Sequence, residues 1–252
     1  MKHIFIKDSD SKATELVLTQ EQAQHLLTVC RCQVGDTLSA VSKKMKYLCK
    51  ITAIHKQTLS FEIVSSQTLN KDPFHFTLLQ ALPKQDKFSD ICRACTEAGV
   101  HHIIPLTTQR CEVKVKNVDQ KRQRWQRILE SAAMQAQRQH IPHLDSLYVF
   151  NDLSHKKETA NTLKLLFWEE AATDRLVYPL LEDYMQQGTK EPYTIQLFIG
   201  PEGGITKSEV ETLIDMGFMC VSLGNTVLRV EHAGLMALAQ IKGYLNYLRE
   251  KK

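Results

Sequence analysis

The chain contains the run Tyr193-Thr194-Ile195-Gln196-Leu197-Phe198-Ile199, followed at once by Gly200-Pro201-Glu202-Gly203-Gly204. The apolar residues of this run predict a buried strand over 193–199. Thr206-Lys207-Ser208-Glu209 has the form of a capping box, so a helix is predicted to begin there. A strand, a glycine-rich turn and a helix in this order place bare backbone at the carboxyl edge of a sheet, where α/β folds bind ligands.

A second loop of the same kind follows the predicted strand 218–223. It begins at Leu223-Gly224 and leads through Arg229 and Glu231 into the last predicted helix. Two such loops on successive parallel strands would lie side by side and could hold a small ligand with backbone N–H and C=O groups. The first loop has neither the P-loop spacing nor the dinucleotide fingerprint, so spacing alone leaves a structural turn equally open. Spacing alone favours structural roles for the two charged residues. Arg229 would be a surface arginine, and Glu231 would be a carboxylate that complements the dipole at a helix start.

Length and composition indicate a soluble, globular and cytoplasmic protein. The 252 residues suffice for one large domain or two ordinary ones, and 43% of them are hydrophobic. No apolar run approaches the ~18 residues that span a bilayer, and the N-terminus lacks the pattern of a signal peptide. We therefore expect no membrane association.

The seven cysteines predict reduced thiols, because their number is odd and no secretory signal precedes them. Cys92-x-x-Cys95 is a candidate metal or redox motif, but it lies in the predicted helix 86–98 and no second motif completes a zinc set. His101 and His102 could assist only if they shared a face, and successive residues of a strand point to opposite faces. We expect no bound metal.

A basic segment stands out against a net charge of only +4. Between 110 and 140, three acidic residues oppose Arg110, Lys114, Lys116, Lys121, Arg122, Arg124, Arg127 and Arg138. Such a face can bind phosphates by counterion release, although most charge runs are simply solvated helix faces. Trp125 could stack on a base, but the spacing favours an inward anchor beside Ile128 and Leu129.

The pattern of predicted elements changes near residue 70. Before it we expect a small β unit with strands at 3–6, 15–18, 37–42, 46–54 and 59–64 and a helix over about 20–30, capped by Thr19 and Gln22. The polar segment 65–73 marks a boundary between domains 1–70 and 74–252. After it, predicted strands at 74–82, 100–106, 163–168, 193–199 and 218–223 alternate with helices at 86–98, 117–139, 173–187, 206–216 and 231–249. This alternation predicts a largely parallel sheet with helices on both faces.

The run Phe198–Gly204, with Leu223-Gly224 and Leu228-Arg229-x-Glu231-x-Ala233, resembles the motifs of the bacterial 16S rRNA (uracil-N3)-methyltransferases. These enzymes belong to the SPOUT superfamily of knotted methyltransferases. Segments along nearly the whole chain follow the same family order, among them Gln80–Lys84 and Ala133-x-Gln135-x-x-Arg138. The resemblance implies an α/β domain with a deep trefoil knot, preceded by a PUA-like β domain that binds RNA.

The resemblance also implies a homodimer that uses S-adenosylmethionine to methylate N3 of a specific uridine in 16S rRNA of the small ribosomal subunit. Three loops would hold the cofactor. Their residues are Phe167, Trp168, Glu169, Ile199, Gly200, Pro201, Glu202, Gly203, Leu223, Gly224, Asn225, Val227 and Leu228.

Arg229 and Glu231 are the expected catalytic residues. The site must stabilise the anion of uracil N3, and Arg229 would do so, while Glu231 would orient Arg229 or accept the proton. N3 lies on the pairing edge, so the base must be unpaired or flipped. Candidate RNA-binding residues are Arg31, Arg110 and Arg138.

Three alternatives stay open at this point. The chain could be another SPOUT-type methyltransferase that acts on tRNA, or a catalytically idle RNA-binding adaptor. The apolar stripe of the last helix could form the dimer contact or could be core; it comprises Ala237, Leu238, Ile241, Tyr244 and Leu245.

Overall fold

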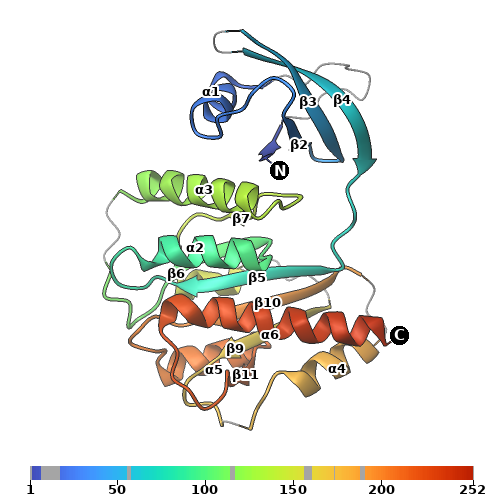
Figure 1. Ribbon diagram of the computed structural model, residues 1–252. Coiled ribbons are helices and arrows are strands. Elements are labelled where there is room, and N and C mark those ends of the chain that lie inside the picture. Colours follow the sequence, from blue (N-terminus) through green and yellow to red (C-terminus); the bar gives the residue numbers. More distant parts are fainter. Residues whose placement is uncertain are drawn as a thin grey trace. The chain divides into compact units, whose positions relative to one another are not determined.

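The computed structural model describes residues 2–6, 18–55, 58–113, 117–155, 161–172, 174–187 and 191–251. The chain divides into two compact units (Figure 1). The N-terminal unit comprises Met1–Lys71 and Ala133–His140, and the larger unit comprises Asp72–Ala132 and Ile141–Lys252. Among the described residues, no helix has both the length and the apolar character needed to cross a bilayer.

The N-terminal unit is a small β domain, as predicted. Its sheet runs in the order β1 (Lys2–Phe5), β2 (Thr37–Val41), β3 (Met45–His55) and β4 (Thr58–Thr68). β1 pairs in parallel with β2, and the other pairs are antiparallel. Helix α1 (Gln20–Thr28) begins with the predicted capping box, in which both reciprocal hydrogen bonds form. Ile4, Leu26, Leu38 and Ile51 meet in the buried core.

Two features of this unit differ from the expectation. β4 continues to Thr68, inside the segment 65–73 that looked unstructured, because Met45 to Leu48 of β3 supply its backbone partners. The end of β4 is exposed, so no hydrophobic alternation marks it in the sequence. The segment 133–140 joins this unit as well, since Nε2 of His3 lies 2.9 Å from the carbonyl oxygen of Arg138. The strand expected at 15–18 falls largely outside the described residues.

The larger unit is built on a parallel sheet, as predicted, which has seven strands among the described residues. Its order is β11-β9-β10-β5-β6-β7, and β8 also pairs with β6. The strands are β5 (Phe74–Ala81), β6 (His102–Thr107), β7 (His143–Leu144), β8 (Tyr148–Val149), β9 (Thr162–Phe167), β10 (Tyr193–Ile199) and β11 (Met219–Val221). β10 lies between β9 and β5, and helices pack on both of its faces, which explains its nearly continuous apolar sequence.

Helices cover both faces of this sheet, as the alternation predicts. They are α2 (Lys87–Ala98), α3 (Val118–Gln135), α4 (Tyr178–Gln186), α5 (Lys207–Asp215) and α6 (Val230–Glu250), with a 3₁₀ segment η1 (Phe150–His155). Leu78, Leu165 and Leu197 pack against α2, α3, α4 and α6 on one face. Leu79 and Phe198 pack against α5 and η1 on the other, because successive strand residues point to opposite faces.

The sequence did not predict β7, β8 or η1, and it misplaced the start of α4. β7 and β8 have two residues each, too few for a period to appear. The segment η1 was not expected either. α4 begins at Tyr178 rather than near 173, and Pro179 in its first turn is the start signal that the prediction overlooked.

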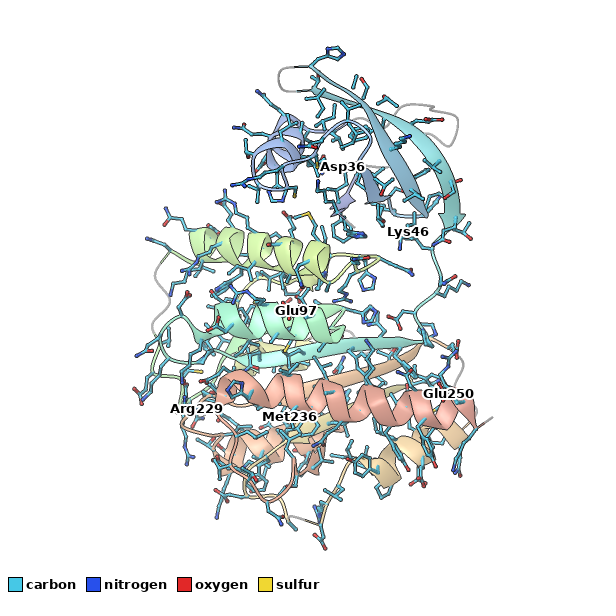
Figure 2. All side chains as sticks on the ribbon, in the orientation of Figure 1. Asp36, Lys46, Glu97, Arg229, Met236 and Glu250 are labelled. Carbon is cyan, nitrogen blue, oxygen red and sulfur yellow. The ribbon has the colours of Figure 1, made fainter. Side chains whose placement is uncertain are left out.

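The apolar stripe of α6 is core rather than an exposed contact face. Ala237, Leu238, Ile241 and Leu245 are fully buried against the sheet and α2. Figure 2 shows this helix running from Arg229, its N-cap, to Glu250 at its far end. Trp125 is likewise an inward anchor of the basic helix, since its ring lies 4.4 Å from that of Phe88.

Replacing Phe198 tests the packing beneath the end of β10. Its ring is fully buried, 6.1 Å from Phe150 and 6.2 Å from Phe218. Phe198→Ala should lower the free energy of unfolding by ~3–5 kcal/mol, because it loses buried area and leaves a cavity. Urea unfolding followed by tryptophan fluorescence measures this in the larger unit, which contains both tryptophans. The control Ile214→Ala removes a side chain that is 50% exposed and should cost under ~1 kcal/mol; equal losses for the two variants would contradict this packing.

Candidate active site

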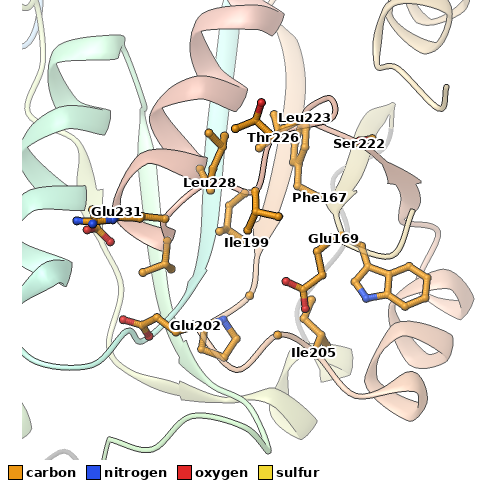
Figure 3. A pocket seen from close by; sticks show the side chains of 18 of the residues that line it. Phe167, Glu169, Ile199, Glu202, Ile205, Ser222, Leu223, Thr226, Leu228 and Glu231 are labelled. Carbon is orange, nitrogen blue, oxygen red and sulfur yellow. The ribbon is translucent and has the colours of Figure 1, made fainter. Parts of the chain in front are cut away.

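Three loops meet at the carboxyl ends of neighbouring parallel strands. β9, β10 and β11 end at Phe167, Ile199 and Val221, and the loops that follow them enclose a cavity of about 440 Å³ (Figure 3). The cavity brings together all but one of the residues that the sequence predicts for the cofactor: Phe167, Trp168, Glu169, Ile199, Gly200, Pro201, Glu202, Leu223, Gly224, Asn225, Val227 and Leu228.

Arg229 and Glu231, the predicted catalytic pair, line the same cavity. Gly203 is the residue that does not. It packs instead against Arg110, whose Nη1 donates to the Gly203 carbonyl oxygen over 3.1 Å. Arg110 therefore lies beside the glycine-rich loop, whereas Arg31 and Arg138 belong to the N-terminal unit.

Seven further residues line the cavity that the sequence did not predict as cofactor-binding or catalytic. Six are chain neighbours of predicted ones: Gly204, Ile205, Ser222, Thr226, Val230 and Ala233. The seventh, Lys87, stands at the start of α2, far away in the sequence. It reaches the cavity because β5, which precedes α2, pairs with β10. The Lys84-Gln85-Asp86-Lys87 run after β5 was its only sequence signal, and nothing local marked it as a site residue.

The glycine-rich loop needs its glycines for packing. A Cβ atom on Gly200 would lie 2.8 Å from Cγ1 of Ile205, a buried residue of the cavity wall. Gly204 has φ +70°, and a Cβ atom there would collide with Oε1 of Glu169. Gly224 in the other loop has φ +106°, and no atom lies within 4 Å of the position of an added Cβ, so a ligand can approach its backbone closely.

Lys87 links two carboxylates at one side of the cavity. Its Nζ lies 3.0 Å from Oε1 of Glu202 and 3.3 Å from Oε2 of Glu231. The backbone N–H of Lys84 donates to both oxygens of Glu202, over 3.2 and 3.0 Å. Among the described residues no ion pair joins Arg229 to Glu231, whose carboxylate lies beside Lys87. Figure 3 shows Glu202 and Glu231 from two different loops on the same side of the cavity.

These contacts fix the charges of the cluster. Partial burial opposes ionisation of Glu202, but the Lys84 N–H and the Lys87 ammonium outweigh it, and the pKa of this carboxyl falls below its usual value. The backbone N–H of Glu231, with help from Lys87, likewise lowers the pKa of Glu231. The hydrogen bond to Glu202 raises the pKa of Lys87. At neutral pH the cluster therefore holds two carboxylates and one ammonium, with the cationic Arg229 nearby.

The cavity also contains a buried donor without a partner. Nε1 of Trp168 is inaccessible to solvent and makes no hydrogen bond within the described part of the chain. An unsatisfied buried N–H costs roughly 1–3 kcal/mol. Apolar walls from Phe167, Ile199 and Leu228, together with backbone from three loops, suit a ligand with a nucleoside part.

Comparisons with known proteins place this chain among RNA methyltransferases. Residues 70–242 match the model of an RNA methyltransferase domain, and residues 18–64 match that of an RNA methyltransferase PUA domain. The ribosomal RNA small subunit methyltransferase E of Synechocystis sp. is 36% identical over 232 residues, 91% of this chain and 73% of the relative. The Bacillus subtilis protein of the same name is 27% identical over 99% of both chains.

A solved structure shows the same fold. A putative methyltransferase from Legionella pneumophila, described with the bound cofactor SAM, superposes with a TM-score of 0.79 at 26% identity and covers 96% of both chains. Fold, cavity and domain matches define an RNA methyltransferase with a PUA domain. Within that class, the chain belongs to the ribosomal RNA small subunit methyltransferase E family.

Removing Lys87 tests the charge cluster. Lys87→Met should raise the pKa of Glu202 and of Glu231, because both carboxylates lose their ammonium. A carboxyl with a lowered folded-state pKa stabilises the fold above its unfolded pKa, and this contribution disappears as the pH falls through the folded value. The stability deficit of the variant should therefore be largest near neutral pH and vanish in acid. Carboxyl NMR titration and urea unfolding across pH measure both effects.

Lys84→Met provides the matched control. It removes an exposed ion pair with Glu112, 2.7 Å long, but keeps the backbone N–H that binds Glu202. This variant should leave the titration of Glu202 and Glu231 nearly unchanged. Identical titration curves for wild type and Lys87→Met would refute the cluster.

Proposed function

We propose that this protein transfers a methyl group from S-adenosylmethionine to N3 of a specific uridine in 16S rRNA of the small ribosomal subunit. Membership of the small subunit methyltransferase E family supports a cofactor-dependent rRNA methyltransferase. The observation that carries the proposal is the cavity formed by three strand-end loops, with a charged cluster on one side. The assignment of N3 as the methylated atom rests on the resemblance of the motif residues to those of the uracil-N3 methyltransferases.

The cofactor would occupy the cavity between the three loops. Backbone groups of Gly200–Glu202 and Leu223–Leu228 would contact its nucleoside and amino-acid parts. When bound, S-adenosylmethionine supplies an electrophilic methyl group on its sulfonium. Glu202 and Glu231 would contribute negative charge near that cation.

Arg229 is the proposed catalytic residue. Uracil N3–H is a poor nucleophile until it loses its proton, and the resulting charge spreads to the ring oxygens. Arg229 is exposed at the cavity mouth and has no ion-pair partner among the described residues, so its guanidinium is available to stabilise that anion. Glu231 has a lowered pKa and is bound to Lys87, which makes it a weak base. We infer that the N3 proton leaves to solvent and that Glu231 positions Lys87.

RNA would be bound by both units. The domain match at residues 18–64 supports RNA contacts from the N-terminal unit, with Arg31 as a candidate. Arg138 belongs to the same unit, and Arg110 adjoins the glycine-rich loop. Such arginines would bind phosphates and position the strand without reading its sequence. The target uridine must leave its pair, because N3 is otherwise hidden in a hydrogen bond.

The family resemblance adds three further proposals. We propose that the chain forms a trefoil knot around the cavity loops, that it is a homodimer and that it works in the cytoplasm. Since the apolar stripe of α6 is core, a dimer contact would use exposed positions such as Met236 and Tyr247. Light scattering of Met236→Glu and Tyr247→Glu would test that contact.

Methylation mapping tests the function directly. The protein and labelled S-adenosylmethionine are incubated with assembled small subunits, naked 16S rRNA and tRNA, and the modified nucleotide is mapped. We expect label at N3 of one uridine in 16S rRNA. Label in tRNA alone would identify a different SPOUT-type enzyme. Saturable RNA binding without cofactor binding would identify an adaptor, and either result would overturn the proposal.

Arg229→Ala should lower the single-turnover rate of methyl transfer by about a hundredfold or more, as loss of a donor to a developing anion does in other enzymes. Calorimetric binding of S-adenosylmethionine should change little, which separates chemistry from cofactor affinity. Arg249→Ala is the control, because Arg249 lies at the other end of α6 in an exposed pair with Glu191. A wild-type rate for Arg229→Ala would remove Arg229 from the chemistry.

Glu231→Gln separates the two roles expected for this carboxylate. Loss of a general base typically costs ~10²–10⁴-fold, whereas an isosteric amide beside Lys87 keeps the shape and polarity of a side chain that only positions the ammonium. We expect a reduction below about tenfold in the single-turnover rate, with an unchanged pH profile. A larger loss, together with loss of a titrating group from that profile, would assign the proton to Glu231.

A further inference from the structure

Two histidines and an aspartate converge in the larger unit, at the opposite edge of the sheet from the cavity. Nε2 of His102 and Nε2 of His143 each lie 3.0 Å from Oδ1 of Asp145. The three ligand atoms lie within 4.8 Å of one another. Because β6 begins at His102 and the cavity loops follow strand ends, this cluster is remote from the methyl-transfer site. We propose that His102, His143 and Asp145 bind a Zn²⁺ ion.

The geometry of His102 differs from that of a hydrogen-bonded histidine. Its Nε2 is buried and makes no hydrogen bond within the described residues, although Oδ1 of Asp145 is only 3.0 Å away. The two atoms are close but do not point at one another. Ligands of one ion have this arrangement, because each lone pair is directed to a common point. Bonds of ~2.0–2.2 Å in a tetrahedral site separate the ligand atoms by roughly 3.3 Å, close to the observed distance.

A neighbouring histidine shows the contrasting arrangement. Nδ1 of His101 lies 3.2 Å from the backbone N–H of Phe76, and its Nε2 lies 3.1 Å from Oδ2 of Asp72. Both ring nitrogens are therefore engaged in hydrogen bonds, and His101 is not a ligand. His101 and His102 use opposite faces of the chain, as successive residues entering a strand do. The proposed metal site therefore includes His102 and excludes His101.

Backbone pairing holds the three ligands in place. His102 is aligned with His143 in the ladder between β6 and β7. The backbone N–H of Asp145 donates to the carbonyl oxygen of Ile103 over 3.0 Å. Zinc sites that have three protein ligands, such as two imidazoles and a carboxylate, keep a fourth position open for water. The side chain of His143 is 68% exposed, so an ion can enter from solvent and keep a water.

The bound ion would link His143 and Asp145, which follow α3 in the chain, to His102 in the sheet. β7 contributes only two residues to the sheet, so backbone pairing alone holds this segment weakly. The sequence predicted no metal, because His102 and the His143–Asp145 pair are separated by the whole of α3. The ion would act on stability rather than on the methyl transfer.

Zinc titration of the reduced, chelator-treated protein tests the site. Calorimetry should show one ion per chain, and the melting temperature of the wild type should rise with Zn²⁺. Cobalt should give visible bands without a thiolate charge-transfer band, which distinguishes these ligands from the seven free cysteines. No saturable Zn²⁺ binding by the wild type would overturn the proposal.

Variants assign the ligands. His143→Ala and Asp145→Asn should each weaken Zn²⁺ by at least about a hundredfold and remove the zinc-dependent rise in melting temperature. His55→Ala, an exposed histidine of the N-terminal unit, should behave as wild type. His143 is mostly exposed, so its variant should fold, and circular dichroism checks this. Unchanged zinc affinity in folded His143→Ala would refute the assignment.

Discussion

The parallel pairing of β10 with β9 on one side and β5 on the other is the constraint on which the larger unit depends. Ile199 is paired in register with Phe167 of β9 and Gln80 of β5. The loops that follow these three strands therefore begin at the same height along the sheet. β11 adds a fourth through its ladder with β9. Bare backbone from separate loops can meet around one ligand only because these ladders hold the strand ends level.

This alignment also explains the charge cluster. Lys87 follows β5 and Glu202 follows β10, so adjacent strand ends bring an ammonium and a carboxylate within 3.0 Å. Glu231 joins them from the start of α6, where a carboxylate is favoured by the helix dipole. Lys87 pairs with Glu231, and Arg229, two residues before it, makes no ion pair within the described part of the chain. One ion pair thus accounts for the different surroundings of the two cations.

Local patterns in the sequence predict the fold well and the site in part. Capping boxes at Thr19 and Thr206, the alternating elements and the glycine-rich loop are encoded within a few residues, and the structure bears them out. Lys87 and the partner of Glu231 could not be predicted, because they depend on which strands become neighbours. β4 beyond residue 64 was missed for a similar reason, since its backbone pairs with β3 while its side chains stay exposed and follow no period.

The two edges of the sheet carry different chemistry for a geometric reason. At the carboxyl edge the chain turns through glycine loops, so backbone and apolar side chains surround a cavity suited to an organic ligand. At the amino edge of β6, short ladders hold side chains in fixed register, which favours a compact set of ligand atoms. An ion there can stabilise the attachment of β7 without altering the charges of Lys87, Glu202 and Glu231. Stability and catalysis can then vary independently, because rigid strands separate the two sites while the same sheet supports both.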